Sequence, residues 1–359
     1  MHDDILIADA TAHGYNWTEE NYKEPGAAGI KDASYGFHQL LTTDPSLVLG
    51  EEEFVRDWPA EDVADTLFYE AGVDFICHHG TPIYDFWKDG NTANQKGWDM
   101  QALHPDRVIT YAAINPYELT ADETRDEVDQ FVKEKGVSGL KVYAARWSNG
   151  RTIEQRLDDE QLAFPMIERA LELGVKAVAT HKAIPVGPVR FDPWGVTDLP
   201  EACSIFPEMN FEVVHTGFAF VEDTTFLAAF PNAYFNLETS FALINRAPRR
   251  FAEFLAALLA MGAGDRIFYS SGMALVHPQA ALRAFLDFEM PEDLVEGFGC
   301  PPLDRELKAK ILGENFLRMH GIDVAGLKAK IADDGVSRRQ ANGLEEPWSN
   351  IRSRIGTPA

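Results

Sequence analysis

Short runs of apolar, often β-branched residues recur along this 359-residue chain and alternate with amphipathic stretches. The runs are ILIAD (5–9), VDFICHH (73–79), VITYAAINP (108–116), GLKVYAA (139–145), KAVATHKA (176–183), FEVVHTG (211–217), AYFNLETS (233–240) and RIFYSSG (266–272). Strands that alternate with helices predict a parallel sheet with crossover helices. Eight such units predict an α/β fold, a (β/α)₈ TIM-type barrel. An open nucleotide-binding sheet has little support, because the chain has no GxGxxG or GxxxxGK[ST] motif.

The stretches between the runs have the pattern of amphipathic helices. Three of them are AEDVADTLFYEAG (60–72), DETRDEVDQFVKEKG (122–136) and QLAFPMIERALELG (161–174). Each ends on a glycine, which suits the position just after a helix. The next apolar run then begins within a few residues, as the βα repeat requires.

We expect a single barrel domain over residues 1–323, with two irregular additions. Residues 14–58 separate the first run from the first clear helix, and a segment this long at the rim of a barrel predicts a lid-like insertion. Its aromatic residues suggest either apolar pocket walls or a small core of the lid itself; they are Tyr15, Trp17, Tyr22, Tyr35 and Phe37. Residues 324–359 predict a C-terminal helix and an extended tail that lies on the barrel or on a partner subunit.

Composition excludes several classes of function. The net charge of −25 disfavours binding to nucleic acid or to anionic membranes. No run approaches the roughly 18 apolar residues of a membrane span. Three widely separated cysteines without a CxxC motif indicate a reducing compartment. The acidic start, MHDD, does not resemble a signal peptide, so we expect a cytoplasmic protein. Its expected partner is a small-molecule substrate.

Histidines gather at the carboxyl ends of the predicted strands, which face the active site in this fold. They are His13, His78, His79, His181, His215 and, just past the last strand, His277. A single histidine at a strand end is usually a hydrogen-bonded core residue, but six on one rim indicate metal binding or acid–base chemistry. Strand alternation means that His78 and His79 cannot both point inward.

Four other side chains are candidates. Lys141 could be a carbamylated metal bridge, an anion clamp, a Schiff-base amine or a buried partner of a carboxylate. Glu238 could be a metal ligand, a general base or one half of an ion pair. Arg146 and Arg190 could clamp a carboxylate or form surface salt bridges.

The strand endings with His13, THK (180–182), VVHTG (213–217) and IFYSSG (267–272), together with KILGENFLRMHGID (310–323), resemble one family. It is the amidohydrolase-related family, in the branch of aminocarboxymuconate-semialdehyde decarboxylase, and the resemblance covers most of residues 5–323. It implies one divalent metal ion, held by two histidines of strand 1, one of strand 5 and an aspartate of strand 8, with an acid–base histidine on strand 6. His13 matches the second histidine of strand 1, His181 matches the histidine of strand 5, and His215 matches the acid–base histidine of strand 6.

Two positions depart from that pattern. Thr11 stands where the first histidine is expected, and Gly272 stands where the aspartate is expected. Two histidines alone hold a divalent ion poorly, since catalytic sites normally supply three protein ligands. Glu238, His78 or His79, or His277 could replace the missing ligand. We predict the set His13, His181 and Glu238, which would suit one zinc, manganese or iron ion.

The predicted function is a metal-dependent hydrolase or carboxy-lyase with His215, Lys141 and Glu238 as catalytic residues. Without the strand 8 aspartate, hydrolysis needs His215 or Glu238 as its base, and decarboxylation demands less of that group. The alternative is a degenerate barrel without metal that serves as a binding or assembly partner. A metal-free lyase with Lys141 as a Schiff base is a third reading. The resemblance also implies a homodimer.

Overall fold

The computed structural model describes residues 4–356 and contains an eight-stranded parallel sheet in the order β1-β2-β3-β4-β7-β8-β9-β10. Its strands are β1 (Ala8–Ala12), β2 (Phe75–His79), β3 (Val108–Ala113), β4 (Gly139–Tyr143), β7 (Ala177–His181), β8 (Asn210–Val214), β9 (Ala233–Asn236) and β10 (Ile267–Phe268). The Ala10 amide donates to the Tyr269 carbonyl at 3.2 Å, and the Gly272 amide donates to the Thr11 carbonyl at 3.0 Å. These bonds nearly close the sheet, so the predicted TIM-type barrel is confirmed.

Nearly all side chains of the eight strands are buried, which explains why their sequences are continuous apolar runs. The first predicted run, residues 5–9, begins before strand β1. Ile5, Leu6 and Ile7 are buried, but they precede the paired residues of the sheet. The last strand is short, because the Tyr269 amide donates instead to the Ile311 carbonyl at 2.8 Å. The barrel therefore places the chain after each strand, and the histidines there, at one rim.

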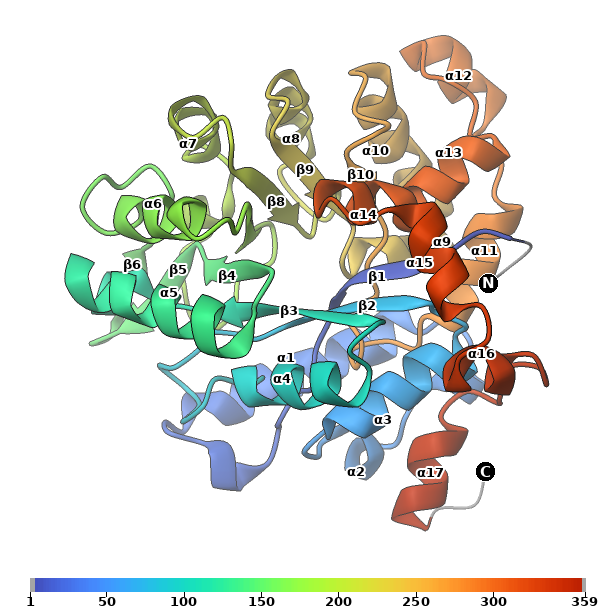
Figure 1. The fold of residues 1–359 in the computed structure, drawn as a ribbon, viewed down its shortest axis with the longest axis horizontal. Helices are drawn as coiled ribbons and strands as arrows, with labels where there is room; N and C mark the ends of the chain where they lie inside the picture. Colours follow the sequence, from blue (N-terminus) through green and yellow to red (C-terminus); the bar gives the residue numbers. More distant parts are fainter. Residues whose placement is uncertain (1–3, 357–359) are drawn as a thin grey trace.

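Helices surround the strands (Figure 1). They are α1 (Gly26–Leu41), α2 (Glu51–Phe54), α3 (Ala60–Asp65), α4 (Asn94–Leu103), α5 (Ala121–Lys135), α6 (Phe164–Glu172), α7 (Leu199–Ile205), α8 (Val221–Phe226), α9 (Leu243–Arg246), α10 (Pro248–Ala260), α11 (Gln279–Asp287), α12 (Glu292–Phe298), α13 (Arg305–Ala309), α14 (Asn315–Met319), α15 (Val324–Ile331), α16 (Gly335–Gln340) and α17 (Ser349–Ile355). Within residues 4–356, none of these helices combines the length and apolar character needed to cross a membrane.

Helix α5 shows how the sequence sets helix ends. Thr120 and Glu123 form a capping box, and Gly136 follows the helix with φ of +66°. A residue with a side chain is strained at that φ, so glycine suits the stop. The three segments read as helices from their pattern, 60–72, 122–136 and 161–174, are all helical over most of their length.

A small hairpin after β4 was not predicted. It pairs β5 (Ala145–Ser148) with β6 (Arg151–Glu154) in antiparallel register. Asn149 and Gly150 form its two-residue turn with φ of +51° and +75°. An Asn-Gly pair is the strongest short-range hairpin signal in a sequence, so this element could have been found.

The predicted insertion at 14–58 contains a long helix and lies over the carboxyl rim. Helix α1 supplies six residues to the wall of a largely apolar pocket at this rim, at positions 26, 29, 30, 33, 34 and 37. This spacing places them on one face of a helix. Of the aromatic residues, Tyr15, Trp17 and Phe37 line that pocket, while Tyr35 packs against Phe54 with ring centroids 5.4 Å apart.

The end of the chain contains the expected C-terminal helix, α15, but beyond it the chain forms two further short helices joined by an irregular segment where an extended tail was expected. Helices α16 and α17 follow α15, and α17 lies beside α2 and α3 (Figure 1). Trp348 is fully buried, and its indole N–H donates to the Leu47 carbonyl at 2.8 Å. The tail therefore docks on its own barrel and insertion. Its contacts are made with residues some 300 positions away, which a local reading of the sequence cannot reveal.

Candidate functional site

A pocket of about 520 Å³ opens at the carboxyl rim. Its floor contains His13, His181, His215 and Glu238. Its walls come from the α1 face, from residues 184–188 and from Ile83, Tyr143 and Leu275. This volume lies in the usual range for sites that bind small molecules. Predicted site residues from four different strands thus meet at one concave surface.

Glu238 and His13 are in direct contact. His13 Nε2 lies 3.0 Å from Glu238 Oε1, and His13 Nδ1 donates to the His79 carbonyl at 2.8 Å. Because Nδ1 already carries a proton, a hydrogen bond from Nε2 requires a second proton between the ring and the carboxylate. Burial alone would raise the pKa of Glu238. Electrostatic attraction from the neighbouring His215, His13 and Lys141 side chains, together with the hydrogen bond from His13, instead holds it well below its usual value.

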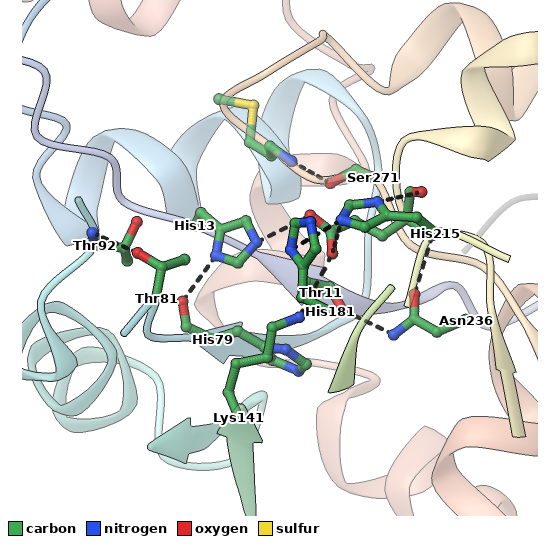
Figure 2. Close-up of polar contacts among 12 residues, drawn as sticks. Thr11, His13, His79, Thr81, Thr92, Lys141, His181, His215, Asn236 and Ser271 are labelled. Carbon is green, nitrogen blue, oxygen red and sulfur yellow. Dashed lines mark hydrogen bonds and ion pairs between the residues drawn. The ribbon is translucent and has the colours of Figure 1, made fainter. Parts of the chain in front are cut away.

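His215 and His181 form a second pair. His215 Nδ1 donates to the Glu238 carbonyl at 3.1 Å, and His181 Nε2 donates to the Ile184 carbonyl at 2.7 Å. The remaining nitrogens, His215 Nε2 and His181 Nδ1, face each other at 3.3 Å (Figure 2). Burial lowers the pKa of His215 to about 4 and that of His181 well below its usual value. Both rings are therefore neutral at pH 7 and present lone pairs to one another.

The backbone is strained at two of these positions. His215 has φ of +65° and Thr239, next to Glu238, has φ of +61°. Residues with side chains rarely adopt this conformation, and it persists only where surrounding contacts enforce it. Here the strain turns the His215 ring toward Glu238, so that His215 Nε2 lies 3.8 Å from Glu238 Oε2.

Lys141 lies beneath the floor and does not line the pocket (Figure 2). Its Nζ is 3.9 Å from Glu238 Oε2, and neither atom has a hydrogen-bond partner among the described residues. Burial lowers the pKa of the Lys141 ammonium, and the Glu238 charge opposes that shift. An amine sealed from the pocket has no access to a carbonyl substrate, which weakens the Schiff-base reading. Its position suits the reading of a buried partner for a carboxylate.

The two departures from the family pattern have structural consequences. The Thr11 hydroxyl donates to the Ala10 carbonyl at 2.8 Å and accepts from Asn236 Nδ2 at 2.9 Å. Gly272 has φ of +67°, and a Cβ there would lie 3.1 Å from Glu238 Cγ. Glu238 therefore occupies the space that a side chain at position 272 would need.

These side chains do not fit a divalent metal ion as they are arranged. No group of three or more histidine, cysteine, aspartate or glutamate side chains within residues 4–356 is placed to hold one. Of the predicted set, His13 contacts Glu238, but His181 contacts His215 instead. The Lys141 ammonium also lies where a divalent cation on Glu238 Oε2 would be repelled. The metal-binding role of His13, His181 and Glu238 stays a prediction that this geometry does not support.

The other candidates for a missing ligand, His78, His79 and His277, do not line the pocket. His78 Nε2 accepts from the Gly14 amide at 3.3 Å, on the side of helix α4. His79 faces the other way and stacks on Tyr111 with centroids 4.4 Å apart, as strand alternation requires. His277 is bound to Glu70 at 2.9 Å.

The two arginines form salt bridges. Arg146 pairs with Glu118 and, at 3.7 Å, with Asp85. Arg190 is exposed and lies 3.3 Å from Asp192. Neither lines the pocket, so a role as a carboxylate clamp has no support from the geometry.

Tyr143 and Tyr15 are site residues that sequence reasoning missed as hydrogen-bond donors. Both line the pocket, and the Tyr143 ring stacks on His181 with centroids 4.3 Å apart. Burial and the Glu238 charge raise the pKa of both phenols well above 10, so both hydroxyls keep their protons. Tyr143 lies two residues after Lys141 on the same strand, and this period-two spacing could have identified it.

Comparison with known proteins agrees with the fold. Under the description "Amidohydrolase", a protein family matches residues 56–322. No curated protein matches the chain. Among solved structures, 2,6-dihydroxybenzoate decarboxylase from Rhizobium has TM-score 0.59 and 14% identity, covering 88% of this chain and 98% of that one.

Two further structures share the fold. A 5-carboxyvanillate decarboxylase from Novosphingobium aromaticivorans, with bound manganese and a nitrobenzoic acid, has TM-score 0.56 and 12% identity, covering 89% of this chain and 98% of the other. A probable 2-pyrone-4,6-dicarboxylic acid hydrolase from Acinetobacter baumannii, with citric acid bound, has TM-score 0.51 and 12% identity, covering 88% and 99%. Relatives of this fold thus include metal-binding decarboxylases and a hydrolase. With about three quarters of its length matched, this chain belongs to the amidohydrolase-related family.

Proposed function

We propose that this protein is an enzyme that hydrolyses a small carbonyl compound by acid–base catalysis, with Glu238 and His215 as its central groups. The observation that carries the proposal is the buried cluster of one carboxylate and three imidazoles on the floor of an apolar pocket. Perturbed titratable groups that converge in a pocket are the usual mark of an active site.

The two pairs in the cluster suit opposite tasks. The His215–His181 pair presents unprotonated nitrogens, which suits a general base for water. The His13–Glu238 pair holds a proton between its atoms, which suits a general acid. Lys141 acts as a positioning residue in this scheme, because it touches Glu238 from below without reaching the pocket.

The reaction balances with these groups. A water proton passes to His215 Nε2 as the water oxygen bonds to the carbonyl carbon. The carbonyl oxygen gains negative charge and accepts a hydrogen bond from a tyrosine hydroxyl, either Tyr143 or Tyr15. The bond to the leaving oxygen or nitrogen then breaks, and that atom takes the proton from His13. The proton on His215 returns to the His13 pair through Glu238, whose Oε2 is 3.8 Å away.

Non-oxidative decarboxylation is the second candidate, because two structures that share the fold are decarboxylases. The same acid pair could protonate the carbon that loses carbon dioxide. A barrel without catalysis remains the alternative, and it requires that the cluster have no chemical role.

The test is a screen for turnover with aryl and alkyl esters, lactones and amides on one side and hydroxybenzoic acids on the other. We expect hydrolysis of at least one neutral compound, and His215→Gln should lower kcat/KM by about 100-fold or more. His320→Gln is the matched control, since His320 is a histidine bound to Tyr111 and lies outside the pocket. Carbon dioxide release without hydrolysis would favour the lyase, and equal activity of both variants would contradict the assigned role of His215.

A further inference from the structure

The pocket walls are largely apolar, and their described residues include no lysine or arginine. Ile30, Phe37, Ile83, Val186 and Leu275 supply hydrocarbon surface on different sides of the pocket. The one carboxylate among the lining residues is Glu238, whose low pKa keeps it ionised.

The cations around the pocket are already engaged by carboxylates. Lys31 on α1 lies 2.7 Å from Asp32 and is absent from the lining face of that helix. Lys96 pairs with Asp57, and Lys182 pairs with Asp198 at 2.7 Å. Lys141 faces Glu238 from below the floor. A carboxylate that entered the pocket would therefore meet Glu238 with no lysine or arginine among the described lining residues to balance it.

This arrangement is unfavourable for an anion. A buried carboxylate without a cationic partner loses several kcal/mol of hydration free energy, and a like charge nearby adds to the cost. The net charge of −25 also lowers the local concentration of anions around the whole molecule.

The polar groups of the wall are donors that suit a neutral acceptor. Tyr15 and Tyr143 keep their hydroxyl protons. Trp17 lines the pocket, and its buried indole N–H has no hydrogen-bond partner among the described residues. A carbonyl oxygen would accept from these groups without bringing a charge.

We infer that the pocket selects an uncharged, largely apolar carbonyl compound, such as an aryl ester, lactone or amide, and rejects free carboxylic acids at neutral pH. This inference deepens the proposed function and rests on it for the use of the same pocket. It separates this chain from two structures of the same fold that hold a nitrobenzoic acid and citric acid. It also removes direct decarboxylation of an acid from the reactions that the pocket favours.

The test measures binding and needs no turnover. Benzamide and benzoate, and then 1-naphthamide and 1-naphthoate, are compared by titration calorimetry with the wild-type protein at pH 7.5. We expect each amide to bind at least about tenfold more tightly than its acid, which corresponds to about 1.4 kcal/mol. Equal or tighter binding of the acids would overturn the inference, and so would failure of both amides to bind.

A charge introduced into the wall sharpens the test. Val186→Lys should raise benzoate affinity by about tenfold over Val186→Met, which is the matched uncharged variant of the same half-buried position. No gain from the lysine would overturn the inference. Failure of the proposed hydrolysis is distinguishable, because an inactive protein could still prefer the amides, and an active one could still prefer the acids.

Discussion

Two buried glutamates in this barrel each contact a histidine, yet their surroundings differ. Glu70 accepts from the amides of Trp348 and Asn350 at 2.6 and 2.8 Å and from His277 Nε2 at 2.9 Å, and it is sealed from solvent. Glu238 accepts from His13, leaves Oε2 without a hydrogen bond and lines the pocket. The comparison shows two uses of a buried carboxylate. Glu70, whose oxygens are all hydrogen-bonded, stabilises the fold, whereas Glu238, which has an oxygen without a hydrogen bond beside a pocket, is available for chemistry.

The largest predicted effect on stability follows from Glu70. Glu70→Ala should lower the free energy of unfolding by about 4 kcal/mol, because it leaves buried donors of the tail without an acceptor. Chemical denaturation measures this. Glu52→Ala is the control, since Glu52 is an exposed residue of α2 and should change stability little. A loss of less than about 1 kcal/mol for Glu70→Ala would show that the tail is not held by this carboxylate.

Two further buried carboxyls, those of Asp9 and Glu212, extend the comparison, because nearby positive charge does not offset the cost of burying them in ionised form. Burial raises the pKa of Asp9 from 3.8 to about 7 and that of Glu212 from 4.5 to about 7. Each is then protonated in the folded state over a range where the unfolded chain is ionised. Stability contributed by these groups is therefore full below pH 4 and is lost as the pH rises to about 7.

We expect the free energy of unfolding to fall by about 3 kcal/mol for each group across this interval, since one pKa unit corresponds to about 1.4 kcal/mol. Asp9→Asn and Glu212→Gln should each flatten the decline, as measured by denaturation at several pH values. Unchanged slopes in both variants would mean that these carboxyls are ionised when folded.

The smallest expected effect is that of metal removal. Dialysis against a chelator should leave both hydrolysis and thermal stability unchanged, because the cluster does not present three ligands to one ion. Metal analysis of the untreated protein provides the control. About one manganese or zinc ion per chain, together with activity that is lost on chelation and restored by the ion, would contradict this expectation.

Local pattern was enough to predict the barrel and the meeting of His13, His181, His215 and Glu238. The parallel strands place their ends at one rim, so residues at those ends must converge. The sequence could not show that Glu238 faces inward, because it lies two residues beyond the end of β9 in a turn with a strained neighbour. The partner of His277 and the docked tail were also beyond reach, since both depend on Glu70, far away in the chain.

The most direct test of the central claim compares Glu238→Gln with Glu70→Gln in kcat/KM for a neutral ester or amide that the protein hydrolyses, expressed per folded molecule. The account predicts a loss of about 100-fold or more for Glu238→Gln, because proton transfer through the cluster fails. It predicts unchanged kcat/KM for folded Glu70→Gln. Equal kcat/KM in the two variants would contradict the assignment of Glu238 to the catalytic site.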